Sequence, residues 1–123
     1  MLRFSYHELH ALYSISQSLS GGDQLKDQLS RVLQILHDEL GMNRGMISLL
    51  DSQSGQFWLD VAHQMEVGQD QIRYGPGEGI TGKVAQNGRP VAVADLGEEP
   101  LFLDRTGARK RLDRKELAFL CVP

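Results

Sequence analysis

The stretch that decides the fold reads Tyr74-Gly-Pro-Gly-Glu-Gly-Ile-Thr-Gly-Lys-Val-Ala85 and is followed by Asn87-Gly88-Arg89-Pro90. Gly75-Pro76-Gly77 interrupts any strand, because proline lacks a backbone donor and glycine accepts a positive φ. Ile80 and Val84 stand four residues apart, which predicts a short helix after Gly79. Asn87-Gly88 should end this helix, and Arg89-Pro90 should lead into a strand over 91–95.

Two interpretations of the glycines stand side by side. A glycine-rich loop that opens a helix presents backbone N–H groups at the positive end of the helix dipole, which favours a bound anion. In the simpler interpretation the glycines serve only a tight strand-to-helix turn. The loop is not a phosphate-binding loop, because Val84 follows Lys83 where that motif needs serine or threonine, and the glycine spacing also misses the dinucleotide-binding pattern.

The segments Gly77–Ala85 and Gly88-Arg89-Pro90, with a strand ending at Asp95, resemble the central signature of GAF domains, a family of small-molecule sensor modules. A second resemblance is narrower, to the GAF domain of Nif-specific regulatory proteins, which are sigma-54-dependent activators of nitrogen-fixation genes. It is carried by Glu98-Glu-Pro100, Phe102–Arg109 and Phe119-Leu-Cys-Val-Pro123. Residues 1–72 fit the family by pattern rather than by motif.

Length and composition predict a single domain over residues 1–123. A net charge of −3 gives no electrostatic case for direct DNA contact. The single cysteine excludes an internal disulfide and suits a reducing compartment, so we expect a cytoplasmic protein. No apolar run approaches the roughly 18 residues of a membrane span, and we expect no membrane contact.

Two helices should occupy the first third of the chain. In residues 5–19 an apolar stripe recurs at steps of three and four residues, and Gly21-Gly22 ends the pattern; the stripe comprises Leu9, Leu12, Ile15 and Leu19. Asp23 is the expected N-cap of a second helix that Gly41 ends. The resemblance implies that the helix within 1–22 pairs with its copy in a homodimer; packing on its own domain is the alternative.

Strand patterns follow. Residues 45–50 and 57–63 predict a hairpin around the turn at 51–55, and shorter strands are expected at 72–74 and 91–95. Residues 117–122 are apolar on both faces and predict a buried central strand. The fold class is therefore α+β, a GAF-like antiparallel sheet flanked by helices. The family adds a further strand and helix after this point, so we expect either a shortened chain or a strand supplied by another copy.

Catalytic groupings are missing from the sequence, and we expect no enzyme activity. His7 and His10 lack the spacing of the metalloprotease helix and should lie on a solvated face. Cys121 lies in the strand predicted to be buried, where a thiol is inert. Asp95, Asp104 and Cys121 are the only set that could hold a non-haem iron.

The segment 98–116 is dense in charge, with six basic residues interleaved with five acids, and is long for a loop. Arginine suits bidentate capture of a carboxylate, whereas a solvated, self-paired segment is the alternative. The resemblance implies that this segment covers a ligand pocket. The residues predicted to bind ligand are Arg73, Gly77, Gly79, Thr81, Arg105 and Arg109.

The resemblance further implies 2-oxoglutarate as effector, an inhibitory partner protein, and, in the full-length activator, an ATPase domain that engages the alternative sigma factor. Ligand binding would act by shifting the population of domain states. Three alternatives stay open: a GAF domain that binds a cyclic nucleotide, a non-haem iron sensor, and a dimerisation scaffold without ligand.

Overall fold

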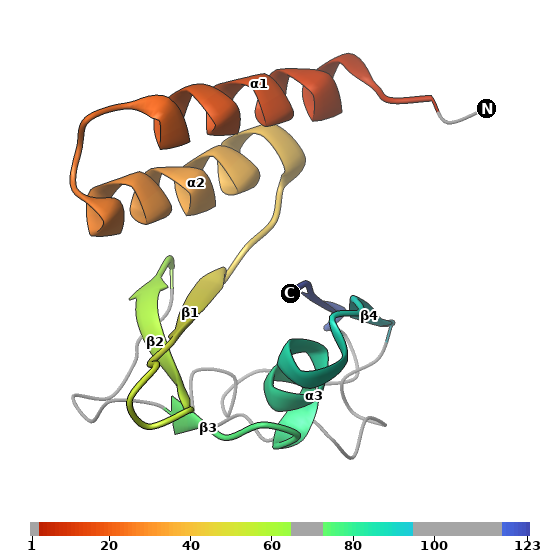
Figure 1. The fold of residues 1–123 in the computed structure, drawn as a ribbon. Helices are drawn as coiled ribbons and strands as arrows, with labels where there is room; N and C mark the ends of the chain where they lie inside the picture. Colours follow the sequence, from red (N-terminus) through yellow and green to blue (C-terminus); the bar gives the residue numbers. More distant parts are fainter. Residues whose placement is uncertain (1–2, 65–72, 95–116) are drawn as a thin grey trace. The chain divides into compact units, whose positions relative to one another are not determined.

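The computed structural model describes residues 3–64, 73–94 and 117–123 (Figure 1). Within these ranges the chain divides into two compact units. The first, called here the helical unit, contains residues 3–48 and 60–64. The second, the loop–helix unit, contains residues 49–59, 73–94 and 117–123. Among the described helices, none is long and apolar enough to cross a membrane.

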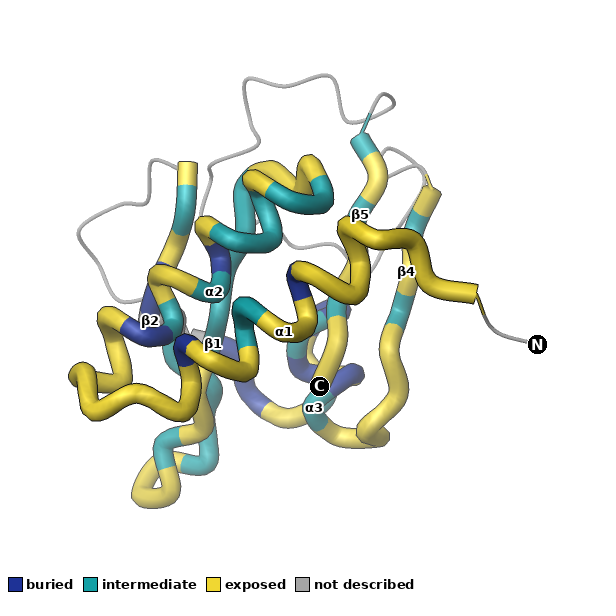
Figure 2. Tube along the Cα trace, turned by 90° about the horizontal axis from the view of Figure 1, so that it is seen from above, coloured by how far each residue is buried: buried dark blue, intermediate teal, exposed yellow. Residues whose placement is uncertain are grey.

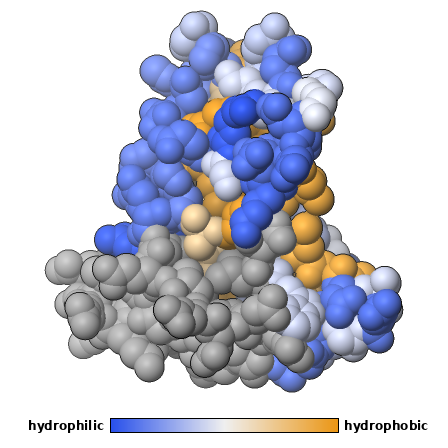
Figure 3. Space-filling model, turned by 90° about the vertical axis from the view of Figure 1, so that its left-hand side faces the viewer, coloured by the Kyte–Doolittle hydropathy of each residue, from blue (hydrophilic) through white to orange (hydrophobic). Residues whose placement is uncertain are grey.

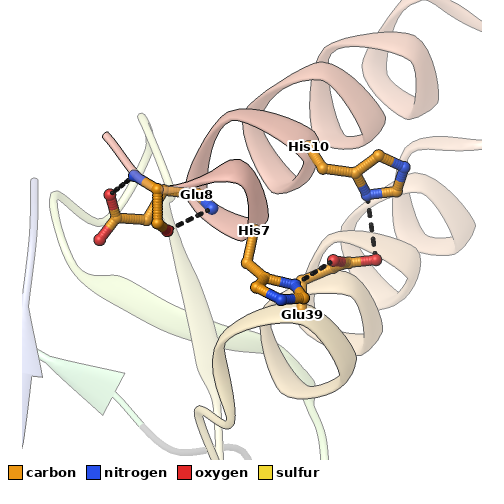
Figure 4. A network of polar contacts seen from close by, with 5 residues as sticks. His7, Glu8, His10 and Glu39 are labelled. Carbon is orange, nitrogen blue, oxygen red and sulfur yellow. Dashed lines mark hydrogen bonds and ion pairs between the residues drawn. The ribbon is translucent and has the colours of Figure 1, made fainter. Parts of the chain in front are cut away.

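Helices α1 (Tyr6–Ser20) and α2 (Leu25–Leu40) run antiparallel and side by side in the helical unit (Figure 1). Ser5 begins α1 with a capping box. Its hydroxyl accepts from the Glu8 N–H at 3.2 Å, and its own N–H donates to the Glu8 carboxylate at 2.9 Å (Figure 4). These two bonds satisfy backbone donors that a helix start leaves without a partner, which stabilises α1 independently of its packing.

The leucines of the α1 stripe are largely exposed, although Leu12 and the half-buried Ile15 line a cavity together with Leu36 and Leu40 of α2. Leu9, Leu12 and Leu19 are 54%, 57% and 48% exposed, whereas Ala11 and Ser18 are buried. Most of α1 is accordingly yellow in Figure 2. The apolar periodicity correctly predicted a helix, but its fully buried residues are the small Ala11 and Ser18, and Ile15 is the half-buried member of the stripe. Figure 3 shows hydrophobic surface emerging between hydrophilic surfaces of the described part of the chain.

The second helix begins one residue later than the sequence suggested. Asp23 is not the N-cap; Gln24 holds that position without a side-chain bond, and Asp23 pairs instead with Arg31 at 3.1 Å. The side chain of Gln28 is buried and donates to the Gly21 carbonyl at 2.8 Å, which ties the first turn of α2 to the connection. At the other end Gly41 adopts φ 65° as the predicted stop, and its N–H donates to the His37 carbonyl.

Polar contacts join the start of α1 to the end of α2. Glu39 lies between two imidazoles, with His10 Nδ1 at 3.0 Å from one carboxylate oxygen and His7 Nδ1 at 3.6 Å from the other (Figure 4). The ring of Tyr6 stacks on His10 with centroids 5.7 Å apart. The prediction that His7 and His10 lie on a solvated helix face is confirmed, since their side chains are 69% and 43% exposed, and Glu39 of the neighbouring helix lies beside both.

The predicted hairpin is present as β1 (Met46–Leu50) and β2 (Phe57–Ala62), which are neighbours in a three-stranded sheet of order β1-β2-β3. Gly55 takes φ 70° in the connecting turn, where its N–H donates to the Asp51 carbonyl at 2.8 Å. Strand β3 (Arg73–Tyr74) pairs antiparallel with β2, with Phe57 opposite Tyr74. Gly-Pro-Gly follows at once and ends β3 after Tyr74, because proline cannot donate to the strand ladder.

The loop–helix unit also contains α3 (Gly79–Asn87), β4 (Val91–Val93) and β5 (Phe119–Cys121). Ile80 and Val84 are 4% and 1% exposed, which confirms the predicted i, i+4 pair. Gly88 ends α3 with φ 69°, and its N–H donates to the Val84 carbonyl. Strands β4 and β5 pair antiparallel with Val91 opposite Cys121.

The prediction that residues 117–122 form a strand buried on both faces is wrong for β5. Leu120 is 56% exposed and Val122 is 64% exposed, whereas Phe119 and Cys121 are half-buried. Successive side chains of a strand point to opposite faces, so one face of β5 is half-buried and the other is exposed. The α+β class, with helices and antiparallel strand pairs, is confirmed.

Candidate functional site

The candidate site is the junction of β3, the glycine loop and α3. Backbone bonds close the loop on itself: the Gly77 N–H donates to the Gly82 carbonyl at 3.0 Å, and the Glu78 N–H donates to the Gly75 carbonyl at 3.1 Å. Gly77 has φ 78° and Gly79 has φ 60°, in the left-handed region that side chains other than glycine rarely adopt. The loop is therefore a rigid turn held by its own backbone.

Gly82 shows why the loop and the helix contain so little side-chain bulk. A Cβ atom at this position would collide with the Gly75 carbonyl oxygen and lie 3.0 Å from the Gly77 nitrogen. Gly82 is itself buried in the first turn of α3. The helix backbone thus packs directly against the loop backbone, a contact that no other residue type permits.

This geometry limits what an anion could use. The N–H of Gly77 is already bonded within the protein, and Glu78 occupies the N-cap position of α3 with an exposed carboxylate-bearing side chain. A negative charge at a helix N-terminus is favourable for the helix itself but opposes a second anion there. The loop N–H groups alone are consequently a poor anion cradle, and binding would depend on cationic side chains.

Thr81 links α3 to β5. Its side chain is half-buried and makes a hydrogen bond with the thiol of Cys121, the free cysteine of β5. Burial raises the pKa of the Cys121 thiol, and the Thr81 bond lowers it by a smaller amount. The thiol thus stays protonated and weakly nucleophilic at neutral pH, as its apolar neighbours in the sequence had suggested.

The six residues predicted to bind ligand are described only in part. Gly77, Gly79 and Thr81 meet at the loop and the first turn of α3, where the bonds above give each of them a structural role. Arg73 is in β3 with its backbone opposite Trp58. Arg105 and Arg109 lie outside the described residues, as do Asp95 and Asp104 of the alternative iron set.

In the part of the chain that the structure describes, no three histidine, cysteine, aspartate or glutamate side chains are grouped so as to hold a metal ion. The contact between Gly82 and the loop was missed at the sequence level, although the four closely spaced glycines were the available indication. The bond between Thr81 and Cys121 had no such indication, because forty residues separate its partners along the chain.

The model of the GAF domain family matches residues 24–123. The chain belongs to the GAF domain family. The match begins at α2 and includes the loop, α3 and β5, so the site described above lies within the matched range.

Curated relatives of this GAF domain are regulators of nitrogen fixation. It is 39% identical to the Nif-specific regulatory protein of Herbaspirillum seropedicae, over 94% of this chain and 21% of that protein. It is 38% identical to nitrogen fixation protein AnfA of Azotobacter vinelandii and 35% identical to the Nif-specific regulatory protein of Azospirillum brasilense, each over 94% of this chain. The chain spans about a fifth of the length of these relatives.

Solved structures share the fold. The GAF domain of A. aeolicus nlh2 in an inactive state superposes with a TM-score of 0.85 at 25% identity, over 95% of this chain and 70% of that one. Free methionine-R-sulfoxide reductase from Neisseria meningitidis superposes with a TM-score of 0.71 over the whole of this chain and 71% of that one. Its 21% identity shows the fold alone, so its activity has no bearing on this GAF domain.

Gly82→Ala tests the backbone contact between α3 and the loop. The added methyl group must displace the Gly75 carbonyl, and overpacking of this kind costs about 1–3 kcal/mol of unfolding free energy. Urea denaturation should show this loss. Gly22→Ala is the control, because no atom lies within 4 Å of a Cβ there, and it should leave stability nearly unchanged. Equal stability of the two variants would contradict the contact.

Alkylation of Cys121 tests the Thr81 bond. Because burial raises the pKa of the thiol, its thiolate should form at higher pH in the folded chain than in the unfolded one. Thr81→Val removes the bond that lowers this pKa, so the midpoint of the pH–rate curve for iodoacetamide should rise further. Thr81→Ser keeps a hydroxyl and should resemble the wild type. A lower midpoint in Thr81→Val would refute the assignment.

Proposed function

We propose that this GAF domain is the regulatory sensor module of a transcriptional activator that controls nitrogen-fixation genes. The observation that carries the proposal is the similarity, over 94% of the chain, to Nif-specific regulatory proteins and to AnfA at 35–39% identity. Those proteins are about five times longer than this chain, which leaves room in them for output domains. In that context the module senses and a separate domain acts.

The effector in this proposal is 2-oxoglutarate or a similar small dicarboxylate. Its carboxylates need cationic partners, since the Gly77 N–H is bonded to Gly82 and Glu78 places a negative charge at the start of α3. The arginines with this role in the proposal are Arg73, Arg105 and Arg109. A guanidinium binds a carboxylate in a bidentate manner and remains charged at all physiological pH values.

The mechanism is a shift between two states of the module. A ligand changes the equilibrium only by the difference between its affinities for the two states. The loop is rigid and α3 packs on it through backbone, so a change at the loop moves α3 as a body. Through the bond between Thr81 and Cys121 that movement reaches β5.

Other parts of the proposal concern activity, compartment and partners. The thiol of Cys121 has a raised pKa, which argues against a nucleophilic role and for a module without catalysis of its own. A cytoplasmic location, an ATPase domain, the alternative sigma factor and an inhibitory regulator belong to the activator as a whole. The module itself is a homodimer in this proposal, because α1 presents three exposed leucines.

Arginine substitutions test the effector site. Isothermal titration with 2-oxoglutarate should show binding weakened roughly ten- to a hundredfold when the true partner among Arg73, Arg105 and Arg109 becomes alanine, since a charge-assisted hydrogen bond contributes about 1.5–3 kcal/mol. Arg31→Ala is the control, because that arginine pairs with Asp23 in the helical unit. Wild-type affinity in all three variants would refute the carboxylate site, and tight binding of a cyclic nucleotide would replace it.

Leucine substitutions test the homodimer. Replacing Leu9, Leu12 and Leu19 with serine removes the exposed stripe of α1. Sedimentation velocity at micromolar concentration should then show a monomer where the wild type is a dimer. Leu25→Ser is the control, since Leu25 is 55% exposed but belongs to α2. A wild-type monomer that melts cooperatively would show that the stripe joins no second copy.

A further inference from the structure

Two histidines of the helical unit, His37 and His63, lie close together. His37 comes from the last turn of α2, and His63 directly follows β2. Their ring centroids are 5.4 Å apart and their planes are inclined by 56°. The backbone N–H of His63 donates to the Gly45 carbonyl at 2.9 Å, which holds the backbone of this histidine in place.

Each ring has one nitrogen that is buried and lacks a hydrogen-bond partner among the described residues: Nδ1 of His37 and Nε2 of His63. A buried polar atom without a partner destabilises the folded state and needs an explanation. The two nitrogens do not bond each other. Two such atoms on adjacent imidazoles are explained together if they bind one common ion through their lone pairs.

The spacing of the rings suits a shared ion. Imidazole nitrogens bind zinc at about 2.0–2.1 Å in tetrahedral geometry, which places the centres of two ligating rings about 5 Å apart. The observed 5.4 Å is close to this value. Ordinary aromatic pairs reach the same separation, so the distance alone decides nothing. The buried nitrogens without a partner are what distinguish this pair from a packed one.

Gln64 supplies the outer contact that metal-bound histidines require. Its side-chain amide lies 3.3 Å from Nε2 of His37, the other ring nitrogen from the one that lacks a partner. Amide oxygen and nitrogen can exchange places, so the oxygen can accept the Nε2–H and leave Nδ1 with a free lone pair. A ligating histidine almost always donates its other N–H to such an acceptor.

The backbone is strained at the same place. Among the described residues, Arg44 at φ 55° and Gln64 at φ 53° are the non-glycine residues with positive φ. Arg44 directly precedes Gly45 and Gln64 directly follows His63, the two residues that the backbone hydrogen bond joins. Conformations of this kind are unfavourable and persist where the surrounding structure fixes them, often at ligand sites.

We propose that His37 and His63 form a two-histidine site for a divalent transition-metal ion of borderline softness, of which zinc is the type, with Gln64 as the outer hydrogen-bond partner of His37. The described residues offer no third histidine, cysteine or carboxylate to the site, so water or an added ligand completes the coordination. The bound ion would join α2 to the end of β2 and stabilise the helical unit by mass action.

Zinc titration of the 123-residue chain, purified without a histidine tag, tests the site by competition with a chromophoric chelator. One equivalent should bind. His37→Gln and His63→Gln should each weaken binding by much more than tenfold, and Gln64→Ala by roughly tenfold. The double variant His7→Gln/His10→Gln is the matched control, since it removes the histidines that contact Glu39, and it should bind as the wild type does.

A measurement on the wild type covers the case in which a variant does not fold. Added zinc should shift the ring NMR signals of two of the four histidines, and assignment should identify them as His37 and His63. Shifts confined to His7 and His10, or loss of binding in the control variant but not in His37→Gln, would overturn the proposal. Failure of the wild type to bind zinc would overturn it equally, without any bearing on 2-oxoglutarate binding.

Discussion

The loop–helix unit depends on one constraint, the direct approach of the α3 backbone to the loop that precedes it. Gly82 lies against Gly75 and Gly77 with no space for a Cβ atom, and two backbone hydrogen bonds hold the loop in that position. The direction of α3 follows, and with it the burial of Ile80 and Val84. Because backbone atoms make the contact, surrounding side chains can vary without changing this arrangement.

Periodicity and glycine position made most of the elements predictable. The stops at Gly41 and Gly88 have left-handed φ values, which only the absence of a side chain makes inexpensive. The capping box of Ser5 and Glu8 is also a recognisable sequence pattern, since serine is followed three residues later by glutamate, and it indicates the start of α1. The prediction that Asp23 is the N-cap of α2 was wrong, because the Asp23 carboxylate pairs with Arg31 instead.

What a face packs against was not predictable. An apolar stripe shows that a helix exists, yet nothing in the spacing says whether Leu9 and Leu12 meet the same chain or another surface. The same holds for Leu120 in β5, since the apolar sequence of a strand does not show which of its two faces other parts of the chain cover. The pairing of His37 with His63 joins distant positions, and local sequence rules do not reach that far.

The side of α1 that faces α2 has a mechanical consequence. Ala11 and Ser18 present low ridges, and low ridges interlock weakly with the grooves of a neighbouring helix. Polar contacts near the two ends of the pair therefore add to the resistance to axial sliding of one helix past the other. Glu39 contacts His7 and His10 at one end, and the Gln28 side chain donates a hydrogen bond to the Gly21 carbonyl at the other. These contacts, one near each end, therefore help to fix the register of the two helices along their axes.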